Sequence, residues 1–382
     1  MPAFVLLVVL MFGSLAGAQA SPASELAAAI GLLGAFEFQA RTEAAKVVRR
    51  APAAAAVPAL EAAARSHADE YVRFKALVLL SGIDPGVMTR VAAELLTDRN
   101  DRVRTVAYQW FEQHPQPDML PRLLEMLPRE TSEFVRPALT SALAASWRDV
   151  NVQQVLRPLV LRGEDHFRGS VITALGEHGA TFALPELLTV VRLDGPLKDD
   201  AITALGRLAV PSSRSVVAGL QKAASPELQP TVSAALCLMG TDCPARVAFV
   251  VDTLRYASTA ERQTALLRGA VHAAAMLAQG GQDEAFDALV DAALTAKGAA
   301  RDAVILGVGL VILRRPTMAL DQFEQRQQSQ GLVALYRDAF DMLSEDFHEE
   351  SVGVTVRRAF WAAPEGSVTR TAAASLLDAL EF

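Results

Sequence analysis

Residues 164–191 read EDHFRGSVITALGEHGATFALPELLTVV, a stretch with the features of one complete pair of helices. Phe167, Val171 and Leu175 recur at intervals of four, which places them on one face of a first helix. Glycines after this helix supply the conformations that end it. A second apolar stripe begins at Leu184-Pro185, where proline fits the first turn because an amide hydrogen there has no helical partner.

The same unit recurs along the chain with a steady period. A hydrophobic residue followed by a polar one precedes an Ala/Leu-rich helix at six positions: Val72-Arg73, Val103-Arg104, Val135-Arg136, Phe167-Arg168, Leu197-Lys198 and Leu228-Gln229. The second members are 31, 32, 32, 30 and 31 residues apart. We interpret residues 261–277 and 300–313 as irregular later copies. Such a period indicates an internal repeat of two helices.

The recurring pattern is Val-Arg, then Ala-Leu about six residues later, then glycine, then Leu-Pro-x-Leu-Leu as at residues 120–124. The patterns of tetratricopeptide and ankyrin repeats do not recur. The pattern resembles the HEAT-repeat family, and more closely its short variant of the phycobilisome-lyase type, from about Ser24 to Arg315. The resemblance implies an armadillo-type fold but no single function, because HEAT repeats serve scaffolds, transport factors, lyases and a few DNA-repair enzymes.

These features predict an all-α protein, since sustained strand-type alternation is hard to find. We expect a right-handed α-α superhelix of eight to ten HEAT-like helix pairs, with the Val-Arg helices on the concave face. Helices packed ~8 to 10 Å apart would form a curved rod on the order of 80 to 100 Å long. The predicted core positions are Val103, Ala107, Leu139, Leu143, Val171, Leu175, Leu205 and Leu236.

We divide the chain into three parts: residues 1–20, 21–315 and 316–382. The first, MPAFVLLVVLMFGSLAGAQA, resembles a secretory signal peptide cleaved after Ala20, although no Lys or Arg precedes its apolar run. The alternative is an uncleaved signal anchor. The second part is the repeat array, and the third is a helical segment that caps it. A signal peptide predicts a periplasmic or secreted protein, and the Ala-rich composition, with more Arg than Lys, suggests a bacterium.

Charge and motifs exclude several functions. The 36 basic and 43 acidic residues give a net charge of -7, which argues against nucleic-acid binding, because phosphate neutralisation supplies most of that affinity. The six histidines are scattered and form no HExxH motif, so we predict no metal site. No Walker loop, dinucleotide fingerprint or Gly-x-Ser-x-Gly elbow is present. We therefore predict no cofactor and no enzymatic activity.

The repeated arginines are the most conspicuous polar residues: Arg73, Arg104, Arg136 and Arg168. Stacked repeats would align them into a ladder that could bind acidic ligands. The favoured interpretation is structural, with each arginine paired to an acidic turn residue, such as Asp101, Glu133 or Asp165, or to carbonyls of a neighbouring repeat. Because exposed pairs contribute only about 0 to 1 kcal/mol each, their role would be to fix repeat register as much as to add stability.

Four aromatic residues in or near the early Val-Arg helices are the candidate binding residues: Tyr71, Tyr108, Trp110 and Trp147. Aromatic side chains on an inner helix are natural anchors for a partner protein. Packing against an adjacent repeat is the alternative.

Cys237 and Cys243, the only cysteines, could form a disulfide in an exported protein, or remain unpaired.

The segment after Arg315 loses the repeat spacing but keeps helical periodicity. We expect Phe360 and Trp361 to pack on the last regular repeat, and the acidic run at residues 344–350 to be a solvated face. A small interaction module is the alternative for this segment.

We predict an exported scaffold that binds an unidentified protein partner in the bacterial cell envelope. The alternative is a lyase-like HEAT enzyme or small-molecule binder that uses the concave groove.

Overall fold

The computed structural model describes residues 22–260, 262–326, 330–343 and 346–382. This part of the chain forms 22 α-helices and two short 3₁₀ helices, and it contains no strand. The all-α solenoid of helix pairs predicted from the sequence is confirmed. The predicted signal peptide, Met1 to Ala20, lies outside the described residues.

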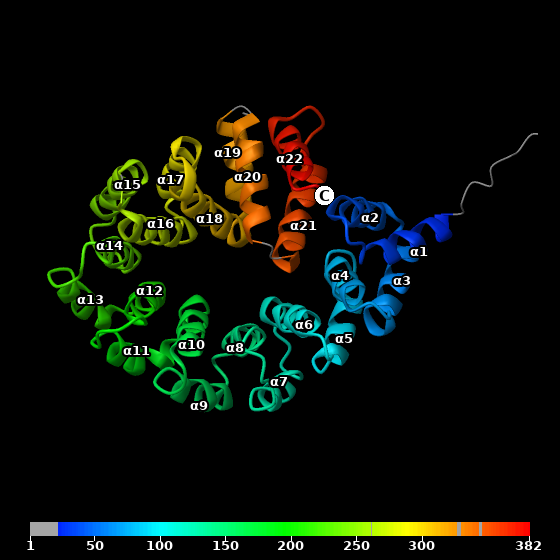
Figure 1. Ribbon diagram of the computed structural model, residues 1–382. Coiled ribbons are helices and arrows are strands. Elements are labelled where there is room, and N and C mark those ends of the chain that lie inside the picture. The colour runs from blue at the N-terminus through cyan, green and yellow to red at the C-terminus, as the bar shows by residue number, and fades with distance from the viewer. Residues whose placement is uncertain (1–21, 261, 327–329, 344–345) are drawn as a thin grey trace, which may run out of the picture.

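Helices alternate between an inner and an outer layer (Figure 1). The inner helices are α2 (Phe38–Arg50), α4 (Glu70–Ser81), α6 (Asp101–Gln113), α8 (Arg136–Ala144), α10 (Asp165–Glu177), α12 (Lys198–Leu208), α14 (Gln229–Leu238), α16 (Thr264–Gln279) and α18 (Gly298–Arg314). The outer helices are α1 (Pro22–Leu32), α3 (Ala53–Ser66), α5 (Pro85–Leu95), α7 (Leu120–Met126), α9 (Val150–Leu159), α11 (Leu184–Val190), α13 (Arg214–Leu220), α15 (Cys243–Thr259) and α17 (Asp283–Thr295). The 3₁₀ helices Thr181–Ala183 and Pro211–Ser213 lead into α11 and α13. The Val-Arg helices form the concave side, as predicted.

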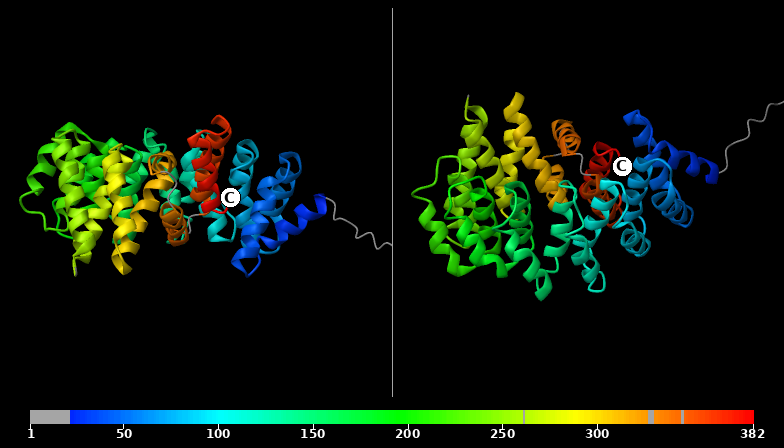
Figure 2. Two further views of the ribbon diagram at one scale, coloured as in Figure 1. Left: turned by 90° about the horizontal axis from the view of Figure 1, so that it is seen from above. Right: turned by 60° about the horizontal axis from the view of Figure 1, so that its bottom comes forward.

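The array closes into a ring (Figure 1), which corrects the expectation of a curved rod. Four helices complete it: α19 (Pro316–Gln325), α20 (Gln330–Leu343), α21 (Asp346–Ala362) and α22 (Val368–Ala379). Helix α21 packs against α18 on one side and against α4 on the other. The C-terminal helices also lie beside the N-terminal ones in both views of Figure 2. The C-terminal segment therefore joins the two ends of the array as well as covering the last repeat.

Inner helices approach one another through small residues. A Cβ atom added at Gly176 of α10 would lie 2.7 Å from the Cα atom of Ala204 in α12. One repeat later, a Cβ atom at Gly206 would lie 2.7 Å from the Cα atom of Ala235 in α14. These glycines are thus required for close backbone approach. Successive outer helices from α5 to α13 make only sparse direct contacts with one another.

The core follows the repeat pattern. All eight core positions predicted from the sequence are fully buried. Trp361 is the exception among the residues expected to pack, because 73% of it is exposed at the end of α21. Its ring instead contacts Phe360 edge to face, and Phe360 packs partly against the core. The prediction for Trp361 is therefore wrong: its exposed ring lies 5.6 Å from the guanidinium carbon of Arg370 in α22.

The described residues contain no single helix with the length and apolar composition of a membrane span. Helices α18 and α19 together meet that test, but the chain bends by 113° between them.

The close approach of inner helices makes a testable prediction. Gly206→Ala should lower the free energy of unfolding by about 1 to 3 kcal/mol, because the new methyl group meets backbone that has no room to retreat. Gly219→Ala, on exposed α13, is the matched control, since a Cβ atom there meets nothing within 4 Å. Urea unfolding of both variants measures the difference. Equal effects of the two substitutions would show that α12 and α14 are not held at backbone distance.

Candidate functional site

The ring is closed by an ion-pair cluster that we call the seam, formed by Glu350 of α21 with Arg49 and Arg357. The guanidinium group of Arg49 donates from Nε and Nη2 to Oε2 of Glu350, at 2.9 and 2.7 Å, and Arg357 donates to Oε1 at 2.8 Å. Glu350 is only 1% exposed. Burial alone would raise the pKa of Glu350, but the two guanidinium groups hold it below its usual value.

The chain makes space for this cluster at the end of α4. A Cβ atom at Gly82 would lie 2.6 Å from Oε1 of Glu350, so only glycine leaves room for the carboxylate. Lys75 pairs with Asp346, and the ring of Phe382 lies 4.4 Å from the guanidinium carbon of Arg49. The interpretation of residues 344–350 as a solvated face is therefore wrong for Glu350, because ring closure buries the inner face of α21.

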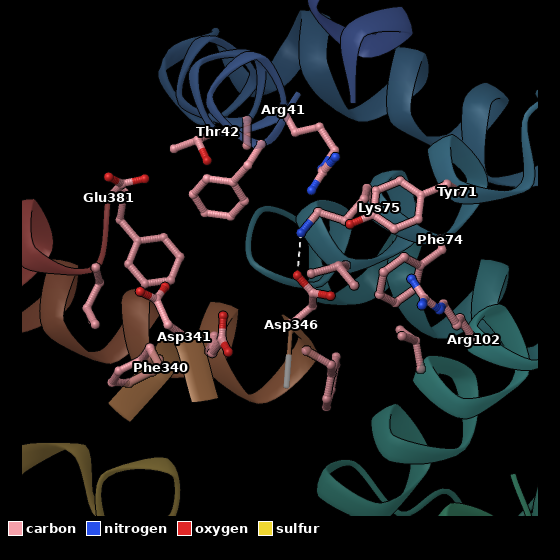
Figure 3. Close-up of a pocket in the computed structure, with 18 of the residues that line it drawn as sticks. Arg41, Thr42, Tyr71, Phe74, Lys75, Arg102, Phe340, Asp341, Asp346 and Glu381 are labelled. Carbon is pink, nitrogen blue, oxygen red and sulfur yellow. Dashed lines mark hydrogen bonds and ion pairs between the residues drawn. The ribbon is translucent and has the colours of Figure 1, made fainter. Parts of the chain in front are cut away.

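A cavity of about 610 Å³, the seam pocket, opens beside this cluster. Figure 3 shows that its walls come from opposite ends of the chain. One wall consists of residues from α2, α4 and α6, and it carries Phe38, Arg41, Tyr71, Phe74 and Arg102. The other wall comes from α20, α21 and the C-terminal residues, and it carries four carboxylates and one arginine: Asp341, Asp346, Glu349, Glu381 and Arg337. The pocket therefore has a basic aromatic wall opposite an acidic one.

Of the four aromatic residues proposed as anchors, Tyr71 lines the seam pocket. Tyr108 and Trp110 are only 1% and 3% exposed, so the structure corrects both assignments. The hydroxyl of Tyr108 donates to the carbonyl of Leu96, and Nε1 of Trp110 donates to Oγ1 of Thr89, so both rings fasten α6 to α5. Trp147 is half-buried after α8 and packs against the core, with Arg148 over its ring.

A second and larger cavity, the lumen cavity, occupies about 820 Å³ inside the ring. Its lining comes from α6, α8, α10, α12, α16, α18, α20 and α21. Phe134, Thr105 and Gln109 line both cavities, which makes them neighbours. Phe134 is 78% exposed, which is unusual for a large apolar side chain on an inner surface.

Polar side chains bridge opposite walls of the lumen. Glu177 of α10 accepts from Arg314 of α18 at 2.5 Å and from Arg207 of α12 at 3.1 Å. Arg207 also donates to the side chain of Gln279 in α16. A second contact joins α6 to α10, where Nε2 of His178 lies 3.1 Å from Oε1 of Glu112. The bond between Arg207 and Glu177 joins consecutive repeats, whereas the others connect repeats that are farther apart in sequence and brace the ring across its interior.

A further polar group lies where α12 meets α16. Oγ1 of Thr203 is 2.9 Å from Nε2 of His272, and burial lowers the pKa of His272. In the described part of the chain, Oδ1 of Asp199 is buried without a hydrogen-bond partner. Burial, with a contribution from the neighbouring Asp199 carboxylate, raises the pKa of Asp200 to about 6. His272 is one of the six scattered histidines for which no ligand role was expected, and Asp199, Asp200 and Thr203 have no distinctive signal in the sequence.

The repeated arginines join consecutive loops. Arg73 donates to the carbonyl of His67, after α3, and to Asp98, after α5. Arg104 repeats the arrangement one unit later, with the carbonyl of Asp98 and with Glu130 after α7. Each guanidinium group thus satisfies a carbonyl that the end of an outer helix leaves unpaired, and it also fixes the spacing to the next repeat.

The ladder of arginines changes after two units. Arg168 follows the pattern in part, donating to the carbonyl of Val160 and pairing with Asp165 at 2.7 Å. Arg136 does not pair with Glu133 in the described structure, which corrects that expectation. Its guanidinium carbon lies 3.8 Å from the centre of the Phe167 ring instead, and its Nε has no hydrogen-bond partner. The arginines therefore do not form one continuous ligand-binding row.

Cys237 and Cys243 are joined by a disulfide, with their Cα atoms 4.1 Å apart, across the turn between α14 and α15. Among the described residues, no group of three or more His, Cys, Asp and Glu side chains has the arrangement of a metal site.

No protein-family model matches the sequence, and no curated protein is significantly similar to it. Among solved structures, Kap121p has a TM-score of 0.31 and 12% identity, covering 93% of this chain and 45% of that one. Kap95p, from a study of its binding to RanGDP, has a TM-score of 0.33 and 13% identity, covering 92% and 61%. The C-terminal fragment of the Chaetomium thermophilum cohesin loader SCC2 has a TM-score of 0.29 and 13% identity, covering 93% and 38%. The chain spans less than two thirds of each of these proteins.

The helix pairs described above make the chain an α-solenoid of the HEAT and armadillo kind. TM-scores below 0.5 carry no argument about this chain. The seam and the two cavities are therefore interpreted from this chain's own residues.

The seam makes a second prediction. Glu350→Gln removes the buried negative charge that lies between two partly exposed guanidinium groups, and it should cost about 3 kcal/mol. Hydrogen exchange should accelerate in α2, α4 and α21 but stay unchanged in α10 and α12. Glu365→Gln, at an exposed turn, is the control. Because the folded-state pKa of Glu350 is depressed, the seam should keep full strength above about pH 4.3 and weaken as the pH falls below it. Uniform exchange in the variant would contradict a local seam.

The raised pKa of Asp200 predicts that this group lowers the stability of the protein as the pH rises, which is opposite to the effect of Glu350. Between about pH 4 and about pH 6 the folded chain holds a proton that the unfolded chain releases, so stability should fall as the pH rises through that window. Asp200→Asn should therefore be more stable than the natural protein at about pH 7, and the difference should vanish near pH 4. Asp194→Asn, at a fully exposed carboxylate, should change little at either pH. Urea unfolding at both pH values measures the stability of each variant. If Asp200→Asn raised the free energy of unfolding equally at both pH values, the prediction would be wrong.

Proposed function

We propose that the protein is an exported, non-enzymatic scaffold that holds a polypeptide segment of a partner protein inside its ring. Its site of action would be the periplasm or the exterior of a bacterial cell, after cleavage of residues 1–20. The observation that carries this proposal is the interior position of Phe134, which is 78% exposed and borders both cavities. An aromatic side chain held ready in a concave site is the usual anchor for a protein partner.

The rest of the interior supports a polypeptide occupant. Phe38 is 60% exposed and lines the seam pocket, as Phe134 does, and Leu310 is 43% exposed in the lumen cavity. Between these apolar groups lie carboxylates and guanidinium groups of both signs. A polypeptide segment presents apolar side chains and charges in alternation, which matches this lining. The net charge of -7 and the acidic wall of the seam pocket argue against nucleic acid.

A second candidate function rests on the polar group at α12 and α16. In this reading the chain is a small-molecule binder or an enzyme of the lyase-like HEAT group, as the resemblance to repeats of the phycobilisome-lyase type would imply. The hydrogen bond between Thr203 and His272, together with the buried Oδ1 of Asp199, favours it. Native mass spectrometry of protein purified from envelope extract separates the two functions, because a bound small molecule supports the second candidate and a bound polypeptide the first.

The scaffold function predicts where a partner will cross-link. A photoreactive benzoylphenylalanine replacing Phe134 should form a covalent adduct with a polypeptide in intact cells. The same group replacing Tyr256, which is 58% exposed on outer helix α15, is the control and should form none. Adduct formation is read as a mass shift on a gel. N-terminal sequencing of the mature protein, expected to begin at Ser21, tests export separately. Adducts at position 256 but not at position 134 would reject binding inside the ring.

A further inference from the structure

Two arginines on the basic wall of the seam pocket share one aromatic platform. The guanidinium carbons of Arg41 and Arg102 each lie 5.5 Å from the centre of the Tyr71 ring. Arg102 also lies 5.7 Å from the ring of Phe74, and Arg41 lies 5.8 Å from that of Phe38. Figure 3 shows Arg41, Tyr71, Phe74 and Arg102 together along this wall. Arginines that stack on rings are held in place, which reduces the entropy lost when they bind a ligand.

Neither arginine is neutralised by a carboxylate in the described part of the chain. Nη1 of Arg41 donates to the carbonyls of Ala35 and Phe36, both at 2.8 Å. The side chain of Arg102 is exposed, and no hydrogen bond or ion pair of its own is found among the described residues. Asp101 beside it is already taken by Arg104 and by the hydroxyl of Ser132.

Four other arginines inside the ring have carboxylate partners. Arg49 and Arg357 bind Glu350, while Arg207 and Arg314 bind Glu177. Arg41 and Arg102 differ from these four, and both face a cavity with room for a ligand. Two guanidinium groups that line a cavity and have no carboxylate partner can bind an anionic group. Guanidinium groups bind carboxylates through paired hydrogen bonds.

The opposite wall restricts what that anion can belong to. Asp341, Asp346 and Glu381 lie on the wall opposite the platform, where Glu349 and the single arginine Arg337 also line the pocket. Lys75 is already paired to Asp346. A ligand with negative charge on all sides, such as a nucleic-acid strand, would be repelled by this wall. A polypeptide segment can direct its carboxylates to the platform and its neutral or basic groups to the acidic wall.

We infer that the Arg41–Tyr71–Arg102 platform recognises acidic side chains of the partner segment, and that it orients this segment in the seam pocket. The inference rests on the proposed function and narrows its partner to a polypeptide with Asp or Glu interleaved with aromatic residues. Phe38 and Phe134, two exposed residues in the lining of the same pocket, receive the aromatic residues.

The test uses the full-length mature protein and fluorescein-labelled short peptides in which Glu alternates with Phe. Matched peptides carry Gln or Lys in place of Glu, and a labelled single-stranded oligothymidylate serves as the nucleic-acid probe. Fluorescence anisotropy should show that the Glu peptide binds most tightly and weakens as salt is added. Arg102→Gln should weaken the Glu peptide about tenfold, the loss expected for one charge-assisted contact, and should leave the Gln peptide unchanged.

Arg102 is the main variant because its side chain makes no hydrogen bond that the fold needs, and a thermal melt confirms that the variant is folded. Arg192→Gln, at an exposed arginine outside both cavities, is the matched control and should have no effect. Any one of three results would overturn the inference. The protein could bind the Glu and Lys peptides equally tightly, or it could bind the oligothymidylate more tightly than the Glu peptide. Arg102→Gln could also bind the Glu peptide as tightly as the unsubstituted protein does. If Phe134 still cross-links a polypeptide in that case, the scaffold function stands and only the acidic specificity fails. If no cross-link forms either, both fail.

Discussion

The shape of this molecule depends on how closely its inner helices approach one another. Gly176 lies against Ala204, and Gly206 lies against Ala235, with no side chain between the backbones. The outer helices from α5 to α13 have no comparable contacts, and several are short. Because the inner layer is compact and the outer layer is spread, each repeat adds curvature of the same sign. Over the whole array this curvature brings α21 back to α4 and creates an enclosed interior.

Closure changes what the interior can recognise. The two walls of the seam pocket come from opposite ends of the chain, so neither half of the protein contains the pocket. Glu350 holds the walls together in a buried cluster with two arginines, an arrangement whose contribution lies in fixing one geometry as much as in stability. Nearby, Arg41 and Arg102 keep their charges available because aromatic rings, and not carboxylates, hold them. The same residue type therefore serves as a structural tie at one point and as a candidate receptor at another.

The sequence was sufficient to predict the repeated helix pairs, but it did not predict that the repeats close into a ring. The spacing of Val171 and Leu175 predicted buried faces correctly, because helical periodicity is a local property. The burial of Glu350 had no local signal, since it ends an acidic run that would normally be solvated. Its environment depends on curvature summed over many interfaces, and no single repeat encodes that sum. Tyr71 and Tyr108 also differ in their exposure, and this difference depends on the face of the helix that each occupies. Tyr71 directly precedes the buried Val72, whereas Tyr108 follows Val103 by five residues and turns toward α5. The sequence shows that both are in inner helices but not which one faces a cavity.

The contact between α21 and α4 also alters how the array should unfold. An open solenoid behaves as a linear lattice whose terminal units each have one neighbour, so that fraying from the ends is the least costly event. Joining the ends gives those units a second neighbour and turns the lattice into a cycle, in which the first unit to unfold must break two interfaces. The ring should therefore resist fraying for as long as the contact between α21 and α4 holds, and its terminal helices should begin to unfold only after that contact breaks.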